Sequence, residues 1–217
     1  MLINLEQILQ EKIQQALFGS LSQPENQNEE RLFGALNKAI PDGALYRLPI
    51  SKDGTLSKPE LVLENLYFAN GFYIDEKRGR FYLSEMMKNR VLAFDLDVSS
   101  GSLSNQKTLA VLPTPDNMEL NSKGQLWVAS PLSNQIYSVD PENGESFVVF
   151  DAQTQVGLNN MKEGIRRIEM GNGFAALLTP ELIGEMPGLL TGVILGDSSQ
   201  PFYVANLGSA LIKVPRK

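Results

Sequence analysis

Two stretches of the sequence, GRFYLS at residues 79–84 and GQLWVA at residues 124–129, decide the fold because they repeat one another. Each begins with a glycine and continues as an aromatic strand, and a second strand follows at Val91 or at Ile136. Equivalent positions in the two copies are 45 residues apart. A repeat of this length, with short strands at fixed positions, is typical of one antiparallel blade of a β-propeller. A β-sandwich with accidental internal similarity is the alternative fold.

A third copy of the pattern lies at the end of the chain. An aromatic residue precedes a β-branched residue by nine positions in every copy: Tyr82 and Val91, Trp127 and Ile136, Tyr203 and Ile212. We therefore expect Tyr82, Trp127 and Tyr203 to occupy equivalent blade positions. For Tyr82 and Trp127 we expect a role in core packing rather than in chemistry.

The whole region from residue 43 onward consists of short β-rich runs that are separated by Gly, Asp, Asn and Pro turns, without helical periodicity. Eight runs stand out: ALYRLPI, ELVLENL, GRFYLSE, NRVLAFDLD, KTLAVLP, GQLWVAS, NQIYSVD and SFVVFDA. Residues 43–217 hold just under four repeats of this length. An open arc of blades leaves strand edges and one side of its core uncovered. We therefore expect either a fragment of a larger ring or an arc covered by the first forty residues and a partner, with self-association through the open edges.

The N-terminal part has a different pattern of apolar and polar residues. From Leu2 to Leu17 the apolar residues recur at intervals of three and four, and Gly19 follows as a stop, which predicts a short amphipathic α-helix. Residues 22–30, SQPENQNEE, contain no apolar side chain and are predicted to form a solvated linker. The expected organisation is thus a helix and linker over residues 1–42, and propeller blades over residues 43–217.

Composition excludes several kinds of chemistry. The chain of 217 residues has no cysteine and no histidine, which removes thiolate nucleophiles, disulfides, Ser-His-Asp triads and imidazole metal ligands. The net charge of −6, without a basic stripe, argues against a nucleic-acid partner. No apolar run is long enough to cross a membrane, and the N-terminus lacks the pattern of a signal peptide. We expect a soluble chain without a recognisable targeting signal, cytoplasmic by default and without a membrane partner.

Several motifs connect the chain with a known family. YFANGF at residues 67–72 is followed by TPDNM at residues 114–118, and PGLLTG at residues 187–192 by YVANLG at residues 203–208. In this order, at blade spacing, they resemble the senescence-marker-protein/gluconolactonase family and its paraoxonase and strictosidine-synthase-like relatives. The resemblance covers about residues 43–217. It implies a six-bladed propeller of which about four blades are present, so that the chain looks like an N-terminally incomplete member.

The same resemblance implies a calcium ion, or another divalent cation, in the central channel and the hydrolysis of a small lactone or ester. Family metal ligands fall on Asn70 and Asp116, and the Asp-Asn pair of the paraoxonases makes Asn117 a third candidate. The oxygen atoms of these side chains are hard ligands of the kind that calcium collects. Asp116 is also the candidate catalytic base that activates water. On residue type alone, Asn70-Gly71 favours a tight turn, and Asp116 is equally compatible with a turn cap; the family resemblance favours a ligand role for Asn70.

This sequence departs from the family in ways that bear on activity. The paraoxonases use histidines beside the metal, and Pro131 stands about where one of them would fall. The glutamate ligand of the family's first blade has no match in residues 1–42. Two or three side-chain oxygens are fewer than the six to eight ligands that calcium takes, so water or another chain has to supply the rest.

Three functions therefore stay open: a metal-dependent lactonase or esterase, a non-catalytic propeller module, and a strictosidine-synthase-like protein without metal. Two further features receive structural interpretations. Glu85 follows an aromatic strand and is expected to be an exposed loop carboxylate. The stretch GNGFAA at residues 171–176 imitates a dinucleotide-binding fingerprint after a strand-like segment, but Pro180 and Pro187 leave no room for the required helix, so a Gly-Asn-Gly hairpin turn is expected.

Overall fold

The structure is a computed structural model that describes residues 16–21, 34, 36–51, 53–197 and 201–215. Its strands are β1 (Ala16–Leu21), β2 (Gly43–Pro49), β3 (Glu60–Leu66), β4 (Ala69–Asp75), β5 (Arg80–Glu85), β6 (Arg90–Asp97), β7 (Ser102–Val111), β8 (Met118–Leu120), β9 (Leu126–Ser130), β10 (Gln135–Val139), β11 (Ser146–Asp151), β12 (Leu190–Ile194), β13 (Phe202–Asn206) and β14 (Ile212–Val214). Its helices are α2 (Gln155–Glu169), α3 (Pro180–Ile183) and the 3-10 turns η2 (Met86–Lys88) and η3 (Ala175–Leu177).

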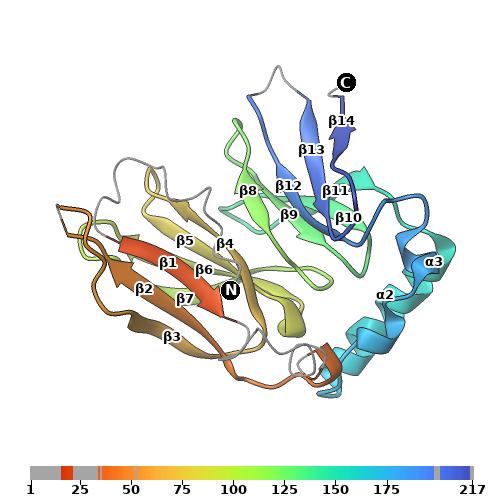
Figure 1. The fold of residues 1–217 in the computed structure, drawn as a ribbon, viewed down its shortest axis with the longest axis horizontal. Helices are drawn as coiled ribbons and strands as arrows, with labels where there is room; N and C mark the ends of the chain where they lie inside the picture. The colour runs from red at the N-terminus through yellow and green to blue at the C-terminus, as the bar shows by residue number, and fades with distance from the viewer. Residues whose placement is uncertain (1–15, 22–33, 35, 52, 198–200, 216–217) are drawn as a thin grey trace.

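The strands form four antiparallel sheets in which neighbours in sequence are neighbours in space (Figure 1). The first sheet has the order β1-β2-β3 and the fourth β12-β13-β14. The second sheet is β4-β5-β6-β7, and the third is β8-β9-β10-β11. Meandering sheets that repeat around an axis are the defining feature of propellers, so the expectation of an all-β, propeller-type fold is confirmed. The number of blades in a complete ring stays a prediction.

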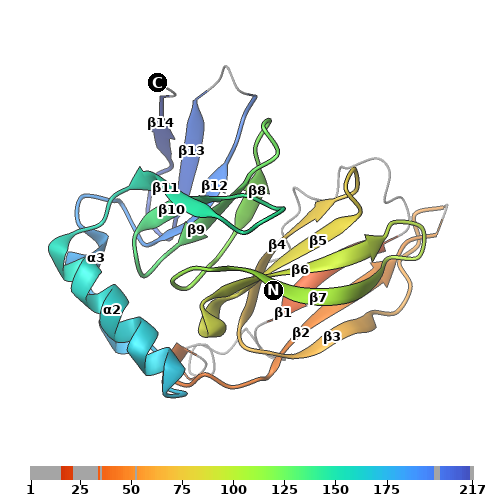
Figure 2. The same ribbon diagram turned by 180° about the vertical axis from the view of Figure 1, so that it is seen from behind.

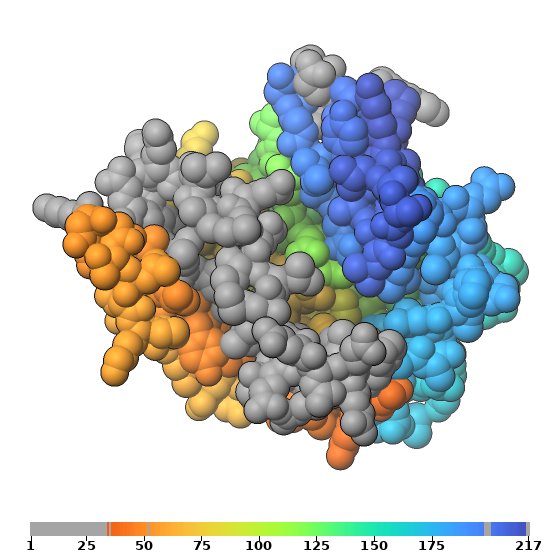
Figure 3. All heavy atoms as spheres, viewed as in Figure 1, coloured from red at the N-terminus to blue at the C-terminus, as the bar shows by residue number. Residues whose placement is uncertain are grey.

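The four sheets follow one another as an arc. β1 contacts β4, β4 contacts β8, and β12 contacts both β8 and β9, so that the first strand of each sheet meets the first strand of the next. The view from behind shows the same succession (Figure 2). In the space-filling view, the strands β2 and β3 and the strands of the fourth sheet lie on opposite sides of the face (Figure 3).

The predicted repeat is confirmed by the position of its residues. Tyr82, Trp127 and Tyr203 lie in β5, β9 and β13, the second strand of the second, third and fourth sheets. Their β-branched partners lie in the third strand of the same sheets, in β6, β10 and β14. The eight β-rich runs also contain strands, namely β2, β3, β5, β6, β7, β9, β10 and β11.

Apolar side chains fill the spaces between successive sheets. One buried cluster joins the first and second sheets around Leu45 and Phe81, and another joins the second and third sheets around Tyr82 and Leu126. Between the third and fourth sheets, the ring of Trp127 packs edge-on against Phe202 with 5.1 Å between ring centroids. Each aromatic residue of the repeat that the sequence assigned to packing therefore contributes to a contact between sheets.

The predicted N-terminal helix is wrong at its end. Residues 1–15 and the predicted linker at 22–30 lie outside the described residues, but Ala16 and Leu17 begin strand β1. Gly19 does not stop a helix, because it lies inside this strand opposite Tyr46 of β2. Backbone hydrogen bonding to β2 outweighs the local helical pattern here. The first sheet thus takes one strand from the region before residue 43.

Helix α2 was not expected, and its presence corrects two predictions. The segment IRRIEM is the last part of α2 rather than a strand, and Gly171 follows the helix with φ of +77° instead of forming a hairpin turn. The amide of Gly157 donates to the Thr154 side chain, which caps the start of the helix. Gly157 and Gly164 are buried where α2 packs, and glycine carries no apolar signal, so the helical periodicity was weak.

Helix α2 also links distant parts of the chain. Its side chain Ile168 joins Met87 and Leu132 in a buried cluster at one end of the sheets. After the helix, the amide of Gly173 donates to the carbonyl oxygen of Asn37 at 2.9 Å. Within the described residues, no helix is long and apolar enough to cross a membrane.

Candidate metal centre

The candidate residues lie where the first strands of three sheets begin. Asn70 is the second residue of β4, Asp116 lies two residues before β8, and Thr191 is the second residue of β12. The pairing of β4 with β5 shifts register between Ala69 and Phe72, so Asn70 sits in a β-bulge. Bulges of this kind redirect side chains and are common beside functional sites.

Asp116 is almost completely buried, with 5% of its surface exposed. Its backbone amide donates to the carbonyl oxygen of Ala129 at 2.8 Å, and the amide of Ala129 donates to the carbonyl oxygen of Asn117 at 2.9 Å. Two backbone hydrogen bonds to β9 therefore fix the backbone of Asp116 and Asn117. No Lys or Arg of the described residues pairs with it. Burial raises the pKa of Asp116 to about 8, and a hydrogen bond from the Asn117 backbone opposes this shift only in part.

Asn117 connects the third sheet to the fourth. Its side-chain Nδ2 donates to Asp116 Oδ1 at 3.1 Å and to the carbonyl oxygen of Thr191 at 2.9 Å. Its backbone amide donates to the same Thr191 oxygen at 3.3 Å. The carboxylate of Asp116 is thus oriented by a neighbour that is itself held by β12.

The glycine of the Asn70-Gly71 pair is explained by a close approach between sheets. A Cβ atom on Gly71 would lie 2.5 Å from the Cα of Asn117 and 2.7 Å from the carbonyl oxygen of Asp116. Any larger residue would push β4 away from the Asp116-Asn117 backbone. The structure therefore brings Asn70-Gly71 directly against Asp116-Asn117, inside a strand and not in the tight turn that the dipeptide alone suggests.

Sequence reasoning assigned no role to Thr191. Leu190 pairs with Asn206 as Ala69 pairs with Glu85, and a register shift follows in both strands. Thr191-Gly192 in the fourth sheet is consequently the structural counterpart of Asn70-Gly71 in the second. The signal was present in the PGLLTG motif, which places a polar residue and a glycine at the same blade position.

The expectation that Glu85 is an exposed loop carboxylate is wrong. Glu85 ends β5 and is only 1% exposed. Its Oε1 accepts from the backbone amide of Tyr67 at 2.8 Å, and its Oε2 forms an ion pair with Arg90 at 2.6 Å. The charge is buried because Arg90, opposite it on β6, neutralises it.

The donor set fits a hard cation with an incomplete protein shell. Among the residues that the structure describes, no group of three or more His, Cys, Asp or Glu side chains gathers as a metal site. Amide and backbone oxygens around the single carboxylate of Asp116 would therefore have to be supplemented by water. A buried carboxylate without a positive neighbour is the feature expected where a cation supplies the missing charge.

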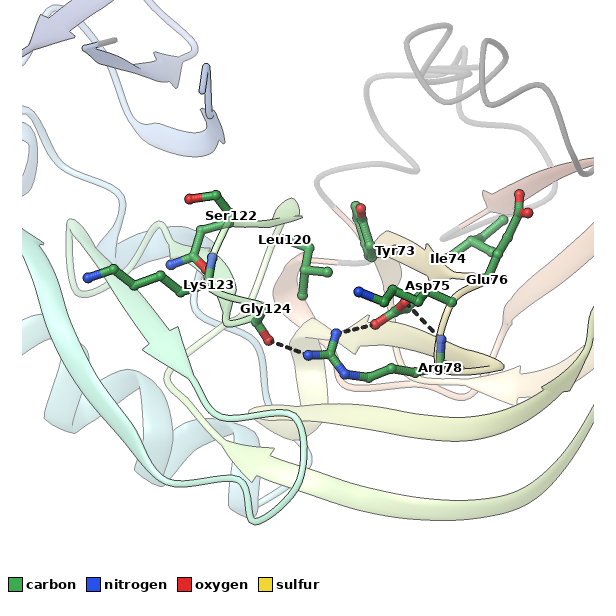
Figure 4. A pocket seen from close by; sticks show the side chains of 11 residues that line it. Tyr73, Ile74, Asp75, Glu76, Arg78, Leu120, Ser122, Lys123 and Gly124 are labelled. Carbon is green, nitrogen blue, oxygen red and sulfur yellow. Dashed lines mark hydrogen bonds and ion pairs between the residues drawn. The ribbon is translucent and has the colours of Figure 1, made fainter. Parts of the chain in front are cut away.

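A hollow lies at the opposite end of the same inner strands, between the β4–β5 and β8–β9 turns (Figure 4). Its volume is about 600 Å³. Arg78 spans it, donating to Asp75 Oδ2 at 2.6 Å and to the carbonyl oxygen of Gly124 at 3.4 Å. This guanidinium is engaged in joining the second and third sheets, and Lys77 and Lys123 also line the hollow.

Fold and site together define a propeller-type protein with an oxygen-donor site where the inner strands meet. The model of the family "SMP-30/Gluconolactonase/LRE-like region" matches residues 14–156. The chain belongs to this family. The match confirms the family resemblance; it begins before residue 43 and ends at residue 156, before the PGLLTG and YVANLG motifs.

Individual proteins are similar to this chain in sequence or in fold. Regucalcin of Danio rerio is 28% identical over 110 residues, which cover 49% of this chain and 36% of the relative. A calcium-binding protein, regucalcin, from Agrobacterium tumefaciens has a similar structure with a TM-score of 0.53 and 14% identity, over 88% of this chain and 49% of that one. The structure of a gluconolactonase from Xanthomonas campestris is similar with a TM-score of 0.52 and 18% identity, over 80% of this chain and 44% of that one. The chain spans less than half the length of the curated relatives that it matches.

Proposed function

We propose that this chain binds a divalent cation, calcium by preference, through Asn70 and Asp116, and that the bound cation serves the hydrolysis of a lactone or an ester. The observation that carries the proposal is the buried Asp116 carboxylate, which lacks a cationic partner among the described residues and lies where three sheets converge. Hard oxygen donors in this setting suit calcium better than a transition metal.

Each residue of the site has a separate task. Asp116 supplies the negative charge, and because Asn117 occupies its Oδ1, Oδ2 is the atom that binds the cation or accepts a proton from water. Asn70 offers an amide oxygen from the bulge of β4. When bound, the cation supplies a Lewis acid that polarises the substrate carbonyl and stabilises the oxyanion. Burial of Asp116 keeps bulk water from screening these charges.

The test of this function begins with stability. A ligand that binds only the folded state at about 100 times Kd raises the free energy of unfolding by about 2.7 kcal/mol. We expect this increase for the wild-type protein in excess calcium and not for Asp116→Ala. Asn172→Ala, an exposed position beyond α2, should retain it. A wild-type melting temperature that is the same in millimolar calcium and in chelator would contradict the cation site.

Hydrolysis is the second stage of the same test. The wild-type protein should open a δ-lactone or cleave an aryl ester in calcium, and should lose this activity in chelator and in Asp116→Ala. One observation favours a second candidate function, a non-catalytic calcium-binding module: the chain has no histidine, and one carboxylate serves as both ligand and base. Calcium-dependent stability without any hydrolysis would support this second function.

A further inference from the structure

Asn117 occupies a slot between two glycines of different sheets. On one side, a Cβ atom on Gly71 of β4 would lie 3.0 Å from the Asn117 Oδ1. On the other side, a Cβ atom on Gly192 of β12 would lie 3.4 Å from the Asn117 Cβ and 3.8 Å from its Nδ2. The two glycines leave room for the Asn117 side chain, and the backbones of β4 and β12 confine it from both sides.

The orientation of the Asn117 amide is set by its partners. Nδ2 has two N–H groups, and the structure gives it two acceptors, Asp116 Oδ1 at 3.1 Å and the Thr191 carbonyl oxygen at 2.9 Å. The Thr191 carbonyl oxygen can only accept hydrogen bonds, and so can the ionised Asp116 carboxylate, which is the form that would hold a cation. With a cation bound, the nitrogen must therefore face Asp116 and Thr191, and the oxygen must face the Gly71 backbone.

This orientation is unsuited to a metal ligand. A cation held by Asp116 would meet the N–H groups of Asn117, which repel it. Turning the amide over would bring Oδ1 against the Thr191 oxygen and the Asp116 carboxylate, and both hydrogen bonds would be lost. Family resemblance suggests Asn117 as a third ligand, whereas its geometry suits a different role.

We propose that Asn117 is a positioning residue: it orients the Asp116 carboxylate and ties the fourth sheet to the cation site, without contacting the cation. This inference rests on the proposed cation site. It makes the site depend on β12, through the Thr191 carbonyl oxygen, although Thr191 lies 74 residues from Asn117 along the chain. Residues that orient a metal ligand typically change metal affinity 10- to 100-fold when they are removed.

Europium(III) distinguishes a ligand from a positioning residue, because it occupies calcium sites and its luminescence decay in H2O and D2O counts the water molecules on the ion. The wild-type protein would be compared with Asn70→Ala, Asn117→Ala and the exposed control Asn172→Ala. We expect Asn70→Ala to gain one bound water, because a ligand is lost. Asn117→Ala should keep the wild-type number of waters while its europium affinity falls by at least about 10-fold. Asn172→Ala should match the wild type in both.

The conservative variant Asn117→Ser guards against a failure of Asn117→Ala to fold. Its hydroxyl can still donate one hydrogen bond to Asp116, so we expect an unchanged water count and a smaller loss of affinity. One extra water on the ion in either Asn117 variant would show that Asn117 is a ligand, and an unchanged affinity in Asn117→Ala would show that it positions nothing; both results overturn the inference. A wild-type protein that binds no europium would refute the cation site itself, and with it this inference.

Discussion

Replacing Asp116 by asparagine removes a carboxylate that the fold holds in its protonated form when no cation is present. Burial raises the pKa of Asp116 from 3.8 to about 8. Between these values, the folded protein retains a proton that the unfolded chain releases. The unfolded state therefore binds fewer protons, and the free energy of unfolding of the cation-free wild type falls as the pH rises.

The size of this effect follows from the slope within that window. Each pH unit lowers the free energy of unfolding by about 1.36 kcal/mol. The step from pH 5 to pH 7 therefore lowers the free energy of unfolding of the wild type by about 2.7 kcal/mol through this one group. Asp116→Asn has a similar volume, keeps an oxygen that accepts from Asn117, and does not titrate. Relative to the wild type, we expect it to gain about 2.7 kcal/mol between pH 5 and pH 7.

Urea unfolding in chelator at pH 5, 6 and 7 measures this difference directly. Glu64→Gln, an exposed position on β3, serves as the control and should follow the wild type at every pH. If the stabilities of Asp116→Asn and the wild type run parallel from pH 5 to pH 7, Asp116 is not buried as the structure shows, and the argument for a cation at this site loses its basis.

Three further substitutions and one solution measurement test other parts of the structure. Gly71→Ala should abolish calcium-dependent stabilisation, measured by thermal melts, because its Cβ would lie 2.5 Å from the Asn117 backbone; stabilisation equal to wild type would disprove that close approach. Arg90→Ala should lower the free energy of unfolding in urea by about 3–5 kcal/mol, because Glu85 is then buried without its partner, and a loss below 1 kcal/mol would contradict this. Gly173→Ala should lower the melting temperature, since its Cβ would lie 1.9 Å from a carbonyl oxygen before β2, whereas Gly34→Ala, with open space around it, should not. Light scattering should show concentration-dependent association through the open edges, and a sharp monomer at all concentrations would argue against it.

The sequence predicted the β architecture well because its signal is periodic. In all three copies an aromatic residue precedes a β-branched residue by nine positions, although the third copy follows the second by 76 residues rather than 45. Each copy forms the second and third strands of one sheet. The failures came where local pattern competes with distant pairing. Ala16 and Leu17 fit a helical stripe, yet they pair with Pro49 and Leu48 in an antiparallel strand.

Parts of the site were beyond sequence reasoning for a similar reason. The resemblance drew attention to Asn70 and Asp116, and the structure brings their backbones together through Gly71. The buried state of Glu85 depends on Arg90, which pairs with it on the neighbouring strand β6. The role of Thr191 depends on a backbone oxygen, which has the same chemistry in every residue type. Interactions of this kind are visible only after the strands are placed.

Calorimetric titration of calcium at pH 7, in two buffers that differ in ionisation enthalpy, tests the central claim most directly. With a pKa of about 8, Asp116 is mostly protonated before the cation binds and must lose its proton to bind it. The account predicts binding to the wild-type protein with the release of close to one proton per calcium ion, and no such release from Asp116→Asn. Calcium binding that releases no proton, or that persists unchanged in Asp116→Asn, would contradict the account.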